Sequence, residues 1–119
     1  MINDIETGCQ VYVFDIFDEI WVAFRGTQVT SIDAFIKDVT TDINCALKKT
    51  DYLPENCMVH TGFDKSYQSV REEVLEELEN EYSIRLIGHS LGGALATLLA
   101  GDIRYKVVNF SKTFLNRSA

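Results

Sequence analysis

The chain has 119 residues, 46% of them hydrophobic and one of them proline, which fits one globular domain and excludes a disordered or low-complexity protein. Its net charge of −7 at pH 7 argues against a nucleic-acid partner, because phosphate binding relies on clustered Lys and Arg side chains. No apolar run approaches the roughly 18 residues that a membrane span needs, so we expect a soluble protein.

Two antiparallel strands are predicted near the start of the chain. Apolar residues alternate through 11–16, the run 17–19 interrupts the pattern, and a second apolar run occupies 20–24. The second strand leads into Arg25-Gly26-Thr27. Because ligands bind at the carboxyl ends of strands in open α/β sheets, this turn is expected to lie close to a functional site.

The middle of the chain is predicted to hold two helices separated by an irregular stretch. Residues 31–38 are expected to form a short helix capped by Ser31, and the polar stretch 40–58 is expected to be irregular. Through 63–78, apolar residues recur at spacings of four, three, four and four. This spacing predicts a long amphipathic helix whose acidic residues face solvent.

Three cysteines, Cys9, Cys45 and Cys57, match no zinc-binding or redox spacing, and residues 1–4 lack the basic and apolar regions of a signal peptide. These features favour a reduced, intracellular setting, although a segment preceding Met1 in a longer protein could carry a targeting signal for another compartment. A disulfide between Cys45 and Cys57 stays open as an alternative.

The most informative stretch is 86–100, where a short apolar strand runs into Gly88-His89-Ser90-Leu91-Gly92 and then into a helix rich in small residues. A buried strand before the turn is predicted from Tyr82, Ile84, Leu86 and Ile87, and an apolar stripe on the helix after it from Ala94, Leu95, Leu98 and Leu99. This context is typical of a nucleophile elbow, in which a serine on a sharp strand-to-helix turn exposes its Oγ. The neighbouring chain comes so close that the positions two before and two after the serine must lack a Cβ, and Gly88 and Gly92 supply them. The alternative is a glycine-rich turn in which Ser90 only caps the helix.

The partners of a catalytic serine are harder to find in this chain. A serine hydrolase of this type needs a carboxylate and then a histidine after the nucleophile, and no histidine follows Ser90. His89 adjoins the serine and cannot easily turn back as its base, while His60 lies upstream and is expected to be structural. Asp102 is the only carboxylate side chain after Ser90, and it is too close in sequence for a confident triad assignment.

Beyond the elbow helix, residues 107–110 are predicted to begin another strand. That strand would be an unprotected edge with no successor in the sheet. A sheet of about four strands covered by three helices buries a modest core, so marginal stability or aggregation is expected.

Three motifs occur in order along the chain: Phe24-Arg25-Gly26-Thr27, Val59-His60-Thr61-Gly62-Phe63, and Gly88-His89-Ser90-Leu91-Gly92-Gly93-Ala94-Leu95-Ala96. With these motifs the chain resembles the class 3 lipases, the fungal triacylglycerol lipase-like branch of the α/β-hydrolases, from about residue 11 to residue 105. The resemblance implies an α/β fold, a partial α/β-hydrolase fold with a central sheet and flanking helices. It also implies a single domain over 1–119, truncated after the elbow helix, because the strands that carry the family's catalytic Asp and His have no match here.

The resemblance also implies which residues form the site. Ser90 would be the nucleophile, and the backbone N–H groups of Thr27 and Leu91 would form the oxyanion hole. Independently, the residue after an elbow serine has a free N–H at a helix N-terminus that can stabilise developing negative charge. Thr27 could instead be an ordinary turn residue. The rest of the elbow is formed by Gly88, His89 and Gly92.

A lid is also implied by the resemblance, over residues 28–38, just after the Arg-Gly-Thr turn. Ile32, Phe35 and Ile36 would form its apolar side, although the same face could equally belong to the core. The family's His-Xaa-Gly-Phe motif is matched by His60 and Gly62, which are expected to be structural, with Gly62 permitting the turn into the long helix.

These features predict a serine ester hydrolase that acts on lipid esters, acylglycerols or phospholipids, through an acyl-enzyme on Ser90. The expected partners are the lipid ester and, transiently, a membrane or lipid-droplet surface. No metal or organic cofactor is implied, and the oligomeric state is left open. The alternative is a catalytically incomplete lipase-like fragment or pseudoenzyme that binds a lipid or a partner without turnover, and the missing base supports it.

Overall fold

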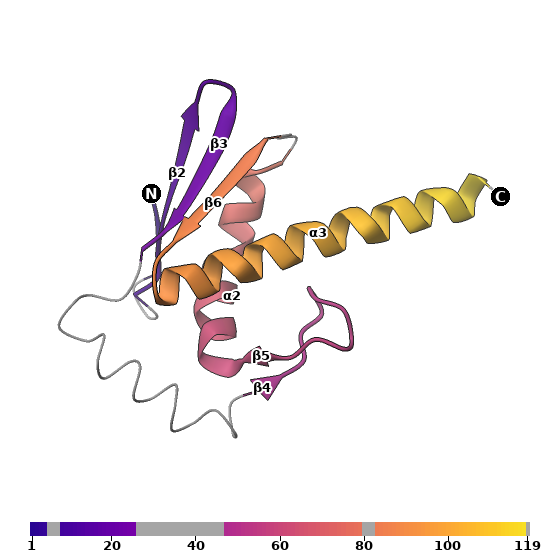
Figure 1. Ribbon diagram of the computed structural model, residues 1–119, viewed down its shortest axis with the longest axis horizontal. Helices are drawn as coiled ribbons and strands as arrows, with labels where there is room; N and C mark the ends of the chain where they lie inside the picture. Colours follow the sequence, from indigo (N-terminus) through magenta and orange to yellow (C-terminus); the bar gives the residue numbers. More distant parts are fainter. Residues whose placement is uncertain (5–7, 26–46, 80–82, 119) are drawn as a thin grey trace.

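A four-stranded sheet with two helices packed on it forms the main body of the structure (Figure 1). The computed structural model describes residues 1–4, 8–25, 47–79 and 83–118, with side chains described as far as residue 107. The sheet has the order β1-β2-β3-β6, and β4 and β5 form a second, two-stranded sheet. The elements are β1 (Ile2–Asn3), β2 (Gln10–Ile16), β3 (Glu19–Phe24), β4 (Leu47–Lys48), β5 (Val59–His60), α2 (Thr61–Glu77), β6 (Ile84–Gly88) and α3 (Leu91–Ser118).

The predicted pair of N-terminal strands is confirmed as an antiparallel hairpin of β2 and β3, in which Ile16 is the register partner of Glu19. Its two-residue turn is formed by Phe17 and Asp18, whose φ angles are 49° and 64°. Two consecutive left-handed residues are the geometry of a type I′ turn, which Asn and Gly favour. The Phe17 side chain is 96% exposed at this end of the sheet.

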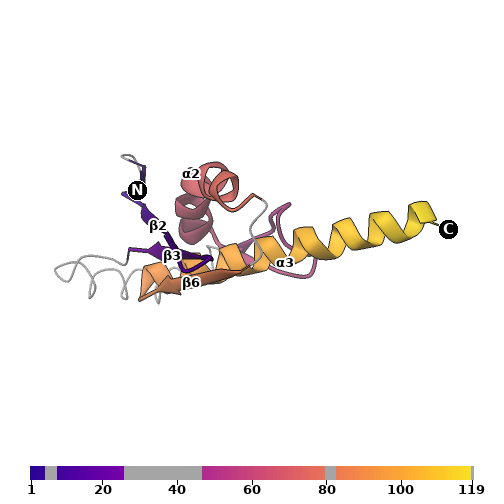
Figure 2. The same cartoon turned by 90° about the horizontal axis from the view of Figure 1, so that it is seen from above.

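The polypeptide returns to the sheet through α2, and β6 then pairs in parallel with β3, with Val22 opposite Leu86. One face of the sheet is buried against both helices, where Val11, Val22 and Phe24 meet apolar residues of α2 and α3 (Figure 2). Among these helical residues are Val70, Val74, Leu95 and Leu99. The amphipathic pattern predicted for 63–78 is therefore confirmed as the apolar side of α2, and the stripe after the elbow as that of α3.

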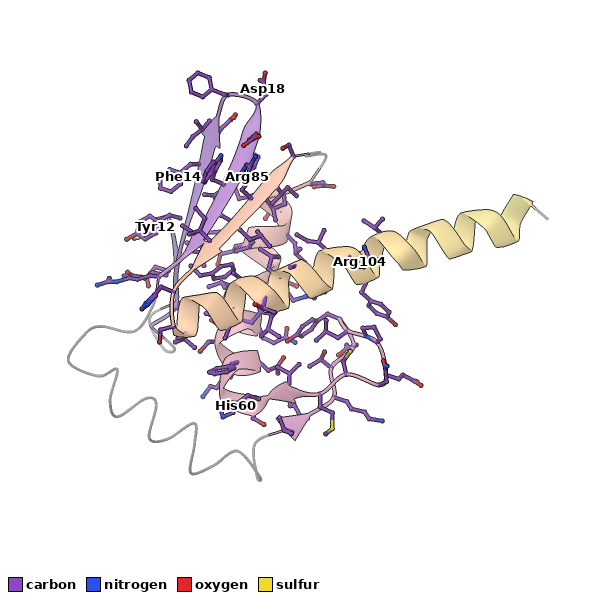
Figure 3. The ribbon with its side chains drawn as sticks, in the orientation of Figure 1. Tyr12, Phe14, Asp18, His60, Arg85 and Arg104 are labelled. Atoms are coloured by element: carbon purple, nitrogen blue, oxygen red, sulfur yellow. The ribbon has the colours of Figure 1, made fainter. Side chains whose placement is uncertain are left out.

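The opposite face of the sheet carries aromatic and apolar side chains that no described element covers. Tyr12 and Phe14 lie along β2 on this side (Figure 3), with their rings stacked 6.3 Å apart between centroids. Phe14 is 48% exposed, and Ile87 on β6 is 46% exposed. The prediction of a buried strand before the elbow is thus wrong for Ile87, because β6 pairs only with β3 within the described part of the chain.

The strand predicted at 107–110 is not formed, because α3 continues through these residues to Ser118. Nothing after Gly101 favours an end to the helix, since residues 102–118 contain neither glycine nor proline. Val107 and its neighbours suit a strand only where other strands pack beside them. The open edge expected on that strand consequently falls on β6. In the part of the chain that the structure describes, no helix is long and apolar enough to cross a membrane.

Of the stretch 40–58 predicted to be irregular, residues 49–58 are irregular and residues 47–48 form β4. Residues 40–46 and the helix predicted over 31–38 lie outside the described part of the chain. His60 has the expected structural role, because its Nδ1 accepts a hydrogen bond of 3.1 Å from the N–H of Gly62 and caps α2. Gly62 itself does not have a left-handed φ, so it does not enable a turn in the way expected. Its lack of a side chain instead leaves room for the His60 ring, which a Cβ would approach to 3.2 Å.

Candidate active site

The turn between β6 and α3 places Ser90 in an unusual backbone conformation. Ser90 has a φ of 57°, in the left-handed region that non-glycine residues rarely adopt. Holding a serine there costs about 1–3 kcal/mol, which the surrounding structure must offset. The Ser90 side chain is exposed at the carboxyl end of β6, immediately before the first residue of α3.

Two glycines are required by how closely the chain passes itself at this turn. A Cβ built on Gly88 would lie 2.1 Å from the carbonyl oxygen of Gly92, and one built on Gly92 would lie 2.3 Å from the carbonyl oxygen of Phe24. Real Cβ atoms essentially never approach other atoms closer than 3.0 Å. The first turn of α3 is therefore packed directly against the end of β3, with backbone touching backbone.

Backbone hydrogen bonds close the turn on either side of Ser90. The N–H of Gly92 donates to the carbonyl of His89 at 3.0 Å, and the N–H of Ala94 donates to the carbonyl of Ser90 at 3.2 Å. Leu91 is the first residue of α3, and the N–H groups of a helix's first turn have no intrahelical acceptor. Such a group next to an exposed hydroxyl can donate to an oxyanion.

No base for Ser90 is brought to it by the residues that the structure describes. His60 is held as the cap of α2 by its bond to Gly62, and its ring lies 4.6 Å from the ring of Phe63. His89 is exposed on the turn itself. Asp102 lies on α3 about 18 Å from Ser90, at a rise of about 1.5 Å per residue.

Asp102 is buried and its oxygens are already engaged. The Tyr67 hydroxyl donates to it at 2.7 Å, and the Arg71 guanidinium donates at 2.6 Å and 3.2 Å. Burial, followed by the hydrogen bond to Asp102, raises the pKa of Tyr67, and the hydrogen bond to Asp102 raises the pKa of Arg71. These contacts give Asp102 a role in joining two helices, and the sequence interpretation missed it.

The remaining site residues lie outside the described part of the chain. These are Thr27, the second oxyanion donor, and the lid residues Ile32, Phe35 and Ile36. They stay predictions of the family resemblance. Cys45 also lies outside it, so the alternative of a disulfide between Cys45 and Cys57 falls outside the described residues.

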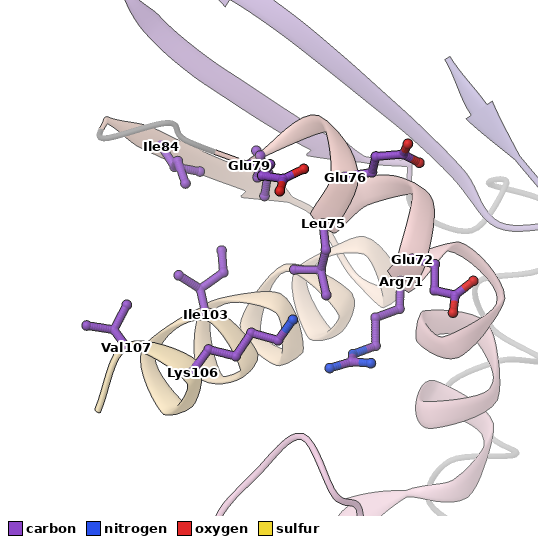
Figure 4. Close-up of a pocket in the computed structure, with 10 residues that line it drawn as sticks. Arg71, Glu72, Leu75, Glu76, Glu79, Ile84, Ile103, Lys106 and Val107 are labelled. Carbon is purple, nitrogen blue, oxygen red and sulfur yellow. The ribbon is translucent and has the colours of Figure 1, made fainter. Parts of the chain in front are cut away.

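Open grooves lie along α3 that could not be expected from sequence patterns, among them the following two. One, of about 760 Å³, lies between the second half of α2 and the middle of α3 and combines Arg71, Lys106 and acidic side chains with apolar ones (Figure 4). The other, of about 480 Å³, runs along the first turns of α3 near the start of α2. The second groove is lined by Leu53, Met58, Val59, His60, Phe63, Ala94, Thr97, Leu98 and Gly101.

The site is an exposed serine on a strained strand-to-helix turn of a mixed sheet. This arrangement is typical of the α/β-hydrolase class of proteins. The family model described as lipase (class 3) matches residues 21–115. The chain therefore belongs to the class 3 lipase family, as the three motifs predicted.

Known relatives agree with this membership. The chain is 50% identical over 104 residues to Lipase A of Sodiomyces alcalophilus, covering 71% of this chain and 24% of that protein. It is 33% identical over 91 residues to the secreted mono- and diacylglycerol lipase A of Penicillium cyclopium, covering 71% of this chain and 28% of that protein.

A solved triacylglycerol lipase, whose catalytic centre is formed by a serine protease triad, superposes with a TM-score of 0.65 and 30% identity. The match covers 88% of this chain and 40% of that lipase. The expected fold is thus confirmed in its coarser form, a central sheet with two flanking helices that matches part of a lipase. The chain spans between about a quarter and two fifths of the length of these relatives.

Proposed function

We propose that this chain carries the nucleophile-bearing part of a serine ester hydrolase that acts on lipid esters, acylglycerols or phospholipids. The Ser90 Oγ attacks the ester carbonyl, the alcohol leaves with a proton, and an acyl-enzyme forms on Ser90. Water then attacks the acyl-enzyme and releases the fatty acid. The N–H groups of Leu91 and Thr27 stabilise the oxyanion in both steps, each contributing about 2.7–4 kcal/mol to the transition state.

The observation that carries this proposal is the conformation of Ser90. A left-handed, exposed serine is held there by two glycines that cannot carry a Cβ, which is a costly arrangement if the serine only caps a helix. An ordinary N-cap residue has an extended backbone rather than a left-handed one. The arrangement therefore supports a nucleophile elbow in preference to a capping turn.

The substrate class rests on the family and on the relatives. Lipase A and a mono- and diacylglycerol lipase are both similar to this chain, which supports a lipid ester as substrate. A substrate of this kind gathers at membranes and lipid droplets, so transient contact with such a surface is part of the proposal. The expectation of an intracellular setting stays a prediction.

A second candidate is a lipase-like protein that holds a lipid without turning it over. It is supported by the lack of a base beside Ser90 among the residues that the structure describes, where His60 is engaged as the cap of α2. Sites that lack a triad member retain about 10³–10⁴-fold acceleration over water, so weak turnover alone does not decide between the candidates.

A fluorophosphonate probe together with hydrolysis of p-nitrophenyl butyrate separates them. We would compare the chain with its Ser90→Ala variant, and with Ser83→Ala, which removes another exposed serine hydroxyl. Labelling and turnover that are lost in Ser90→Ala and kept in Ser83→Ala are expected for the hydrolase. Absence of labelling in all three proteins would refute the claim that Ser90 is a nucleophile in this chain. It would favour the second candidate, a protein that holds a lipid without turnover.

A further inference from the structure

Two buried carboxylates in this structure, Asp64 and Asp102, have the same kinds of partner. Asp64 is 2% exposed, accepts a hydrogen bond of 2.7 Å from the Tyr52 hydroxyl, and lies 2.6 Å from the Lys48 ammonium. Asp102 is fully buried, accepts a hydrogen bond of 2.7 Å from the Tyr67 hydroxyl, and lies 2.6 Å from the Arg71 guanidinium. Each carboxylate thus has one tyrosine and one cation as partners, and Asp64 also accepts a hydrogen bond of 3.5 Å from the Gln68 amide on its own helix.

The two differ in which elements they join. Asp64 belongs to α2, and its partners come from β4 and from the irregular stretch before β5. Asp102 belongs to α3, and both of its partners come from α2. Of these two groups, the Asp102 group therefore has its hydrogen bonds and ion pair on the helix whose first turn adjoins Ser90.

The contacts of this second group leave it little freedom to move. The Arg71 guanidinium lies 5.3 Å from the centroid of the Tyr52 ring, and the rings of Tyr52 and Tyr67 lie 5.1 Å apart at 55°. Because Asp102 and Tyr67 are buried and the Arg71 side chain is 25% exposed, water competes weakly for these hydrogen bonds. A charge-assisted bond with two donor atoms on Arg71 also fixes direction as well as distance.

We propose that Asp102 is a positioning residue for the Ser90 site. Helix α3 is held at its first turn by the contact of Gly92 with the Phe24 carbonyl, and about 2.8 turns further on by Asp102. Two fixed points set both the sliding of a helix along its axis and its rotation about it. The Asp102 group thereby fixes where the Leu91 N–H and the Ser90 hydroxyl lie relative to the end of β3.

This inference rests on the proposed function for its consequence in catalysis, but its structural part can be measured without activity. A displacement of about 1 Å at a reacting group can reduce a rate by about 100-fold. Loss of the Asp102 group should therefore slow the reaction of Ser90 well beyond what loss of overall stability explains.

The test compares Asp102→Asn with Asp64→Asn, which removes the same charge from a matched site whose hydrogen-bond and ion-pair partners lie outside α3. Hydrogen–deuterium exchange is followed in a peptide covering 88–94, together with the rate of fluorophosphonate labelling, at a temperature where both variants are folded. We expect faster exchange in this peptide and about 10- to 100-fold slower labelling in Asp102→Asn, with neither change in Asp64→Asn.

Equal effects of the two substitutions on the 88–94 peptide, or no effect of Asp102→Asn, would overturn the inference. Should Asp102→Asn fail to fold, Tyr67→Phe and its matched control Tyr52→Phe answer the same question while leaving both charges paired. If the unmodified chain is not labelled at all, the proposed function fails, and the exchange comparison still decides whether Asp102 positions the turn.

Discussion

Replacing Gly92 by alanine should destabilise the fold, although alanine usually stabilises a helix. In a helix interior, alanine is favoured over glycine by about 1 kcal/mol. At this position the new Cβ would lie 2.3 Å from the Phe24 carbonyl oxygen, whereas ordinary contacts begin at 3.4 Å. The helix and the end of β3 would have to separate by about 1 Å, against close-packed neighbours on both sides.

The size of the effect follows from this overlap. Overpacking costs about 1–3 kcal/mol where side chains can adjust, and more where the obstacle is backbone. We therefore expect a net loss of about 3 kcal/mol in the free energy of unfolding. For a chain of this size the loss corresponds to a fall of about 10 °C in Tm.

Thermal unfolding followed by circular dichroism at 222 nm measures this loss, with Gly93→Ala as the matched control. A Cβ on Gly93 would come no closer than 3.3 Å to the Gly88 carbonyl oxygen, which a small shift can relieve. Its Tm should change by no more than about 4 °C, equivalent to about 1 kcal/mol. A Gly92→Ala protein as stable as the original would show that α3 does not press on β3, and the close-approach argument for the turn would be lost.

Three further substitutions or conditions follow from the same structure. Ser90→Gly should raise the free energy of unfolding by about 1 kcal/mol because it relieves a φ of 57°, whereas Ser90→Ala should not; identical melting curves for the two would contradict stored strain. Replacing Phe17 by Asn together with Asp18 by Gly should stabilise the hairpin by about 1 kcal/mol, since both positions are left-handed, and a lower Tm would show that the Phe17 ring is needed. Burial raises the pKa of Cys9 from 9.0 to about 11, and burial with a hydrogen bond to a carboxylate raises that of Tyr67. Folded protein then keeps protons that unfolded chains lose, so stability should be constant below about pH 9 and fall as pH rises toward 11; equal Tm values at pH 8 and 10.5 would exclude this.

Local patterns were sufficient to predict the elements that surround the turn. The apolar spacing that defines α2 and the alternation that defines β2 and β3 depend on neighbours in sequence, and each is found where expected. The requirement for glycine at positions 88 and 92 was likewise predictable, since it follows from the shape of a sharp strand-to-helix turn. The identity of Ser90 as a nucleophile stays a prediction.

Features that depend on distant parts of the chain could not be predicted in this way. Val107 suits a helix or a strand, and it lies in a helix here because no strand pairs beside it within the described ranges. Ile87 was expected to be buried because its strand is apolar, but burial requires a covering layer on that face. The Asp102 group offered one usable signal, since Tyr67 and Arg71 are four residues apart and so share a face of α2.

The sheet face turned away from α2 and α3 carries the only tryptophan of the chain. Trp21 lies on β3 between its register partners Phe14 and Arg85, with the Arg85 guanidinium 5.6 Å from the centroid of its ring. The residue is partly exposed although its indole nitrogen is buried, so any layer that settles on this face would remove the exposed part from water. Intrinsic fluorescence would then shift to shorter wavelengths, which gives this chain a built-in optical reporter of what covers the sheet.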